Sequence, residues 1–88
     1  MKIEWHPVHD EVMCFITIGK NELQITKEQN KIFFELCRGN YTIDGMDIHD
    51  LNDIQTFAQN NTEYSFLVEN IDLLTQCTEK TMVQNLGI

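Results

Sequence analysis

A predicted β-hairpin constrains the fold of this chain more than any other feature. Residues 11–18 are apolar on both alternating sides, which is typical of a central strand covered on both faces. Gly19-Lys20-Asn21 follows as a turn, and residues 22–25 return as a second strand with Leu23 and Ile25 facing inward. The chain should therefore contain an antiparallel sheet.

A further strand is predicted before the hairpin. Residues 2–8 alternate, with Ile3 and Trp5 on one side and charged or polar residues on the other. Pro7 has no N–H group to donate to a neighbouring strand, so this strand should lie at an edge of the sheet.

A helix is predicted over residues 26–38. Thr26-Lys27-Glu28-Gln29 has the form of a capping box, and Gly39 stands where a helix often ends. At helical spacing, Ile32, Phe33, Leu36 and Cys37 share one face, and Phe34 lies beyond the edge of that apolar stripe.

The remaining chain predicts alternating elements. Residues 41–43 form a short strand, and Asp44-Gly45 a turn. A helix starts near Asp47 or Asp50 and ends around residues 59–61, and residues 62–69 form a strand. A terminal helix begins after Asn70, and its inward face is Ile71, Leu74, Thr78, Met82 and Leu86. The prediction is a single α+β domain over residues 1–88: a small, mainly antiparallel sheet with three helices on one face, in the order β-β-β-α-β-α-β-α.

The charge of the chain is strongly uneven. The net charge is −8, and residues 39–79 carry eight acidic side chains with no Lys or Arg. Such a field repels nucleic acid and attracts basic partners. No apolar run approaches the length of a membrane span, and residues 1–7 lack the apolar core of a signal peptide. We therefore expect a cytoplasmic protein that binds neither nucleic acid nor membranes directly.

No catalytic or metal-binding motif stands out. His6, His9, Asp10 and His49 do not have the paired spacing of a structural zinc site, and the acids from Asp44 onward do not match a calcium loop. Cys14, Cys37 and Cys77 have apolar neighbours, so they should behave as small buried hydrophobic residues that resist alkylation. We predict no enzymatic activity, no cofactor and no metal.

One segment resembles a known family. The hairpin with the predicted helix that opens Ile25-Thr26-Lys27-Glu28 and ends Cys37-Arg38-Gly39 resembles the start of response-regulator winged-helix domains over about 25 residues. That resemblance implies a DNA-binding fold, but the later predicted helices are acidic and Lys80 is their only base. The chain is therefore not assigned to this family.

The predicted function is a non-enzymatic protein-binding module, such as an inhibitor, an immunity-type protein or an adaptor, whose acidic surface meets a basic partner. Alternatives are a degenerate winged-helix-like regulatory or dimerisation domain, a homodimer included, and a non-catalytic subunit of an enzyme complex. The predicted helix carries an acidic ridge to which we assign no role in folding beyond a small helix-dipole effect. Changing Asp50 and Asp53 to Asn should therefore leave stability nearly unchanged or raise it slightly. The predicted partner-binding residues are Asp47, Asp50, Asp53, Phe34 and Trp5.

Overall fold

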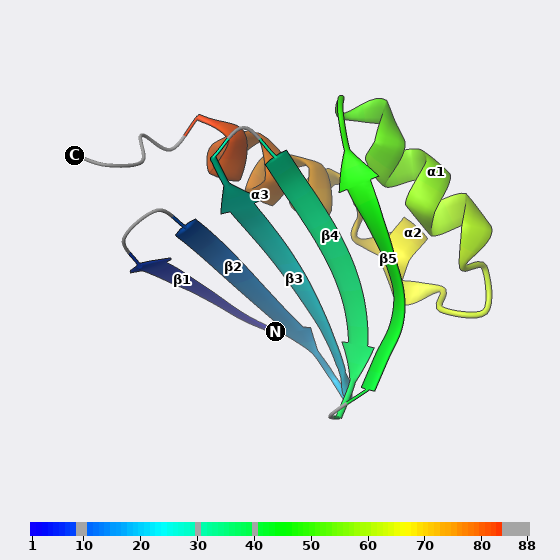
Figure 1. Ribbon diagram of the computed structural model, residues 1–88. Coiled ribbons are helices and arrows are strands. Elements are labelled where there is room, and N and C mark those ends of the chain that lie inside the picture. Colours follow the sequence, from blue (N-terminus) through cyan, green and yellow to red (C-terminus); the bar gives the residue numbers. More distant parts are fainter. Residues whose placement is uncertain (9–10, 30, 40, 84–88) are drawn as a thin grey trace.

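The computed structural model describes residues 1–8, 11–29, 31–39 and 41–83 (Figure 1). Five antiparallel strands lie side by side in chain order: β1 (Lys2–Val8), β2 (Glu11–Ile18), β3 (Asn21–Glu28), β4 (Lys31–Arg38) and β5 (Tyr41–Ile48). Three helices follow: α1 (Asn52–Asn60), α2 (Phe66–Glu69) and α3 (Ile71–Met82). The α+β class and the antiparallel sheet are confirmed. The interleaved order is wrong, because all five strands precede the helices.

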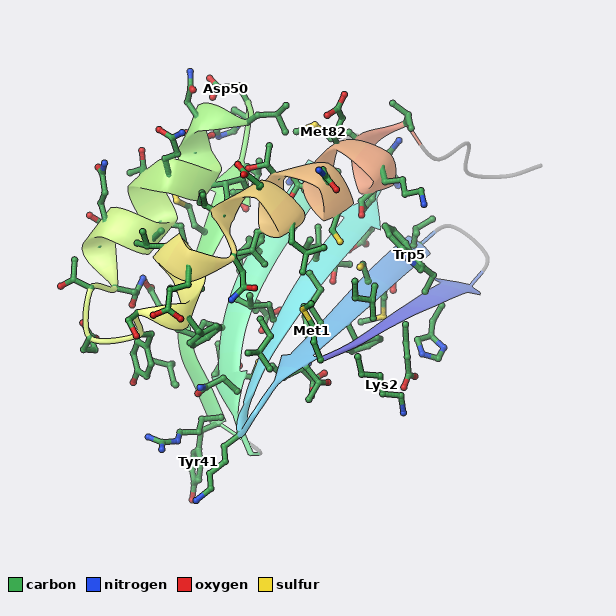
Figure 2. All side chains as sticks on the ribbon, turned by 180° about the vertical axis from the view of Figure 1, so that it is seen from behind. Met1, Lys2, Trp5, Tyr41, Asp50 and Met82 are labelled. Carbon is green, nitrogen blue, oxygen red and sulfur yellow. The ribbon has the colours of Figure 1, made fainter. Side chains whose placement is uncertain are left out.

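The helices cover one face of the sheet and leave the other open (Figures 1 and 2). Directly opposed residues of an antiparallel pair point to the same face. The row that crosses the middle of the covered face is Trp5, Cys14, Ile25, Phe34 and Met46. Cys14, Ile25 and Phe34 in this row are fully buried, so the core lies between this face and the helices.

The helix predicted over residues 26–38 is wrong, because the segment forms the end of β3 and the whole of β4. Ile32, Phe34 and Leu36 also alternate, and in β4 they all point into the core. Gln29 adopts a positive φ of 54° in the turn between the two strands, so it does not close a capping box. The apolar spacing fitted both periods, and pairing between neighbouring strands decided between them.

Two shorter predictions are also wrong. Asp44-Gly45 lies inside β5, which runs on to Ile48 with an irregularity opposite Leu36 and Cys37. Residues 62–69 do not form a strand, because the chain turns and then forms α2. There the N–H of Glu69 donates to the Ser65 carbonyl at 3.1 Å, which is helical hydrogen bonding.

The helices predicted around residues 50–60 and from residue 71 onward are confirmed as α1 and α3. Thr78 and Thr81 of α3 are fully buried. Each hydroxyl donates to the carbonyl four residues earlier, at 2.8 Å, so no buried hydroxyl of this pair lacks a partner. Leu86 lies outside the described residues. None of the helices in the described ranges has the length and apolar character to cross a membrane.

Candidate functional site

The predicted acidic ridge does not exist as one helical surface. Asp47 belongs to β5, Asp50 lies between β5 and α1, and Asp53 lies in the first turn of α1. The Asp53 carboxylate accepts hydrogen bonds from the N–H groups of His49 (2.7 Å) and Asp50 (3.2 Å). Asp50 Oδ1 accepts one from the N–H of Asn52 at 2.8 Å.

These bonds give Asp50 and Asp53 a local structural role. The backbone N–H groups of His49 and then Asp50 lower the pKa of Asp53, since both bonds favour its charged form. Asp50 and Asp53 therefore help to fix the connection from β5 to α1. The prediction placed Asp53 too far along one helix to help folding much, and that geometric basis is wrong, because Asp47 lies in β5 and α1 begins only at Asn52.

Asp47 lies on the open face of the sheet, directly opposite Phe33 of β4. Phe33 is 38% exposed, and its ring packs over Gly45. A Cβ added at Gly45 would come within 2.9 Å of Phe33 Cζ, so the glycine makes room for the ring. Asp47 thus stands beside a half-exposed aromatic side chain on the open face.

Phe34 is not available to a partner in this fold. Its side chain is fully buried and packs edge-to-face against Phe57 of α1, with ring centroids 5.0 Å apart. The prediction of a surface role followed from reading the segment as a helix. In a strand, Phe34 shares its face with the core residues on either side of it.

Trp5 lies on the helix side of β1 and is half-buried against the edge of the core. The Lys80 ammonium of α3 lies 5.8 Å from the centre of its ring, within the range of a cation–π contact. Trp5 therefore keeps exposed area at the boundary between β1 and the helical layer.

The helical layer carries a groove that the sequence did not predict. Two glutamines of α1 and the apolar residues of α2 and α3 form a shallow hollow of about 240 Å³. Its lining residues are Gln55, Ala58, Gln59, Val68 and Ile71. Val68 is 56% exposed, which is unusual for its residue type. The sequence analysis placed Val68 in a strand over residues 62–69, so the missed signal was the helical turn at residues 65–70.

Acidic residues follow two of the lining residues of this groove in the sequence. Glu69 follows Val68, Asp72 follows Ile71, and both side chains are exposed. Across the described part of the chain, the ion pairs are those of Glu4 with Lys2 and His6 in β1. Glu69 and Asp72 are in none of these ion pairs.

The other reactive groups form no site within the described ranges. His6 and His49 belong to opposite edges of the sheet, and His9 and Asp10 lie outside the description. No group of three or more His, Cys, Asp or Glu in the described residues could hold a metal ion. All three cysteines are buried and free, and burial raises the pKa of the Cys14 thiol to about 12. Such a thiol is a poor nucleophile.

Comparison with known proteins found no match: no family model fits the chain, and no curated protein or solved structure is significantly similar to it. The resemblance to winged-helix domains depended on a helix over residues 26–38, and that segment is two strands.

Proposed function

We propose that this protein is a non-enzymatic protein-binding module whose helical layer receives a basic segment of a partner. The observation that carries the proposal is the groove lined by residues of α1, α2 and α3, with the exposed Glu69 and Asp72 next to the lining residues Val68 and Ile71 in the sequence. An apolar centre with a polar, charged rim is the usual anatomy of a protein interface.

The groove suits an aliphatic side chain of the partner. Val68 and Ile71 offer apolar contact, and Gln55 and Gln59 offer amide groups for hydrogen bonds to a backbone. Lys or Arg residues flanking that side chain would lie beside Glu69 and Asp72. Affinity would come mainly from the buried apolar contact, because exposed ion pairs contribute little.

The wider charge distribution supports the same partner. Residues 52–82 carry five acids (Asp53, Glu63, Glu69, Asp72 and Glu79) and one base, Lys80. Their combined field would attract a positively charged surface over several ångströms and raise the rate of association at low salt. An inhibitor, an immunity-type protein or an adaptor would each use such a surface, and the identity of the partner distinguishes them.

Matched variants test this proposal. Four proteins are immobilised and used to capture proteins from a lysate of the native cells. They are the wild type, Val68→Ser, the double variant Glu69→Gln/Asp72→Asn and the double variant Glu22→Gln/Glu28→Gln. The last variant removes the same charge from β3, away from the groove. We expect one basic protein to be retained by the wild type and the β3 variant and to be lost from the two groove variants. Equal retention by all four contradicts the proposal.

A further inference from the structure

β1 is one of the two edge strands of the sheet, and it carries exposed apolar side chains. Among the described residues, β1 pairs only with β2, so its outward backbone N–H and C=O groups face no other described strand. The helices pack chiefly on β2, β3 and β5, and the Lys80 side chain reaches across to Trp5. On the helix side of this edge, Met1 is 76% exposed and Ile3 38% exposed.

This edge is also the electrically neutral side of an acidic protein. Lys2 and Glu4 are the charged residues of β1, and they cancel. The excess of acids belongs to residues 39–79, which form β5 and most of the helical layer. Because β1 and β5 lie at opposite ends of the sheet, two copies that meet at β1 keep their acidic regions far apart.

We propose that β1 is a self-association edge, through which a second copy of this chain pairs antiparallel about a two-fold axis at Ile3. The two five-stranded sheets would then form one continuous sheet. The helical layers of both copies would lie on the same face of it, since a two-fold axis perpendicular to a sheet keeps its faces. This inference does not depend on the proposed function of the acidic groove.

The side chains of β1 select this register. Lys2 would lie opposite the partner's Glu4, and Glu4 opposite the partner's Lys2, so both cross-strand pairs are attractive. On the helix side, Ile3 would contact the partner's Ile3, and Met1 the partner's Trp5. The exposed apolar side chains of the edge would thereby be covered.

Neighbouring registers are less favourable. An axis at Glu4 would set two carboxylates directly against each other, and like charges in that position repel. An axis at Trp5 would bring Pro7 into the ladder opposite Ile3, and Pro7 has no N–H group to donate. In the register centred on Ile3, Pro7 lies beyond the paired segment.

Charge variants test the cross-strand pairs. Lys2→Glu makes both positions acidic, and Glu4→Lys makes both basic, so each variant alone should be monomeric. An equimolar mixture should dimerise, because each acidic position then faces a basic one. Sedimentation velocity from micromolar to millimolar concentration measures the association, with the wild type as the dimeric reference. A wild type that stays monomeric throughout, or a mixture that associates no better than its components, overturns the proposal.

Cysteine cross-linking tests the register. Directly opposed residues of an antiparallel pair have Cα atoms roughly 4.5–5.5 Å apart, within the range that a disulfide spans. Ile3→Cys should therefore form a disulfide-linked dimer under oxidised glutathione. Glu4→Cys is the control and should cross-link far more slowly, since the axis does not pass through it. The wild type should not cross-link, because its own cysteines are buried. Faster cross-linking of Glu4→Cys than of Ile3→Cys overturns the proposal.

Discussion

The two outer strands of the sheet are held in different ways. β5 is fastened to the helical layer by Asn61, a buried side chain that follows α1. Its amide donates to Asp44 Oδ2 of β5 at 2.9 Å and to the Phe57 carbonyl of α1 at 3.0 Å. β1 has no comparable anchor among the described residues, and its side-chain contact with α3 is the cation–π contact of Trp5.

The same contrast separates the two faces of the sheet. The covered face is held by the fully buried core, whereas the open face carries half-exposed side chains such as Phe33. Most of the stabilising contacts therefore lie beneath the helices and near β5. β1 and the open face contribute less to the stability of the fold. Surfaces that contribute little to folding are free to serve recognition.

The largest expected effect compares the two faces of β4. Phe34→Ala removes a fully buried ring from its contact with Phe57, and such a truncation costs about 3–5 kcal/mol. That is a large part of the roughly 5–15 kcal/mol that holds a domain folded. The neighbouring variant Phe33→Ala should lose only about 1 kcal/mol, mainly from the partly buried apolar area of its ring. Denaturant unfolding measures both, and equal losses would contradict the contrast between the faces.

β4 also shows where sequence reasoning succeeded and where it failed. The hairpin of β2 and β3 was predictable, because an apolar strand and a glycine turn leave few alternatives. The expectation that this strand is covered on both faces is wrong, since only every second side chain of β2 is buried. In β4, Ile32, Phe33, Leu36 and Cys37 fit a helical stripe as well as Ile32, Phe34 and Leu36 fit a strand. The ambiguity is physical, because within residues 31–38 the side-chain pattern fits both structures and the pairing with β3 and β5 selects the strand.

The regular spacing of the turns favours a strand over a helix for residues 31–38. The strands begin at residues 2, 11, 21, 31 and 41, so the turns recur about every ten residues. Once β4 was assigned to a helix, Phe34 was placed at the surface and β5 was shortened, and the acids from Asp47 to Asp53 became one ridge. The groove at Val68 was beyond prediction, because it arises where two helices meet in space.

The second effect compares the two edges of the sheet. Asn61→Ala leaves Asp44 Oδ2 and the Phe57 carbonyl without their amide donor and should cost about 1–3 kcal/mol. Lys80→Ala, which removes the contact over Trp5 at the other edge, should cost at most about 1 kcal/mol. Asn60→Ala, at an exposed position beside Asn61, is the control. Thermal unfolding ranks the three, and a greater loss at Lys80 would reverse our comparison of the edges.

A smaller effect compares Asp53 with Asp47. The pKa of Asp53 lies below its ordinary value of 3.8, so its carboxylate stabilises the fold fully above that pH. The contribution is lost as the pH falls from there through the folded pKa. Asp53→Asn should slightly lower stability at neutral pH, since a carboxylate no longer strengthens the two hydrogen bonds from N–H groups. The variant should also lose less stability than the wild type when the pH falls below 3.8. Asp47→Asn on the open face should leave neutral-pH stability unchanged. Urea unfolding at several pH values measures both variants, and the same pH dependence of stability in both would contradict the role of Asp53.

The smallest expected effect concerns the three thiols, which should hardly react with an alkylating reagent in the folded protein. Cys14 of β2 and Cys77 of α3 both belong to the core between the sheet and the helices, and burial is the main cause that raises the pKa of each. Cys37 points to the open face, where its Sγ lies 3.9 Å from Thr42 Oγ1, and burial raises its pKa as well. Because only the thiolate attacks an alkylating reagent, all three should label slowly at neutral pH and readily after denaturation.

The order of labelling tests the comparison between covered and open parts. Exposing Cys37 requires only an opening of the open face at Thr42, near the start of β5, whereas exposing Cys14 requires α3 to leave the sheet. Iodoacetamide should therefore modify Cys37 first, and Cys14 and Cys77 together at the rate of global unfolding. Peptide mass spectrometry gives the order, and Cys37→Ala should abolish the first phase alone. If Cys14 reacted as fast as Cys37 while the fold stayed intact, the helical layer would not be the firmly held side of the molecule.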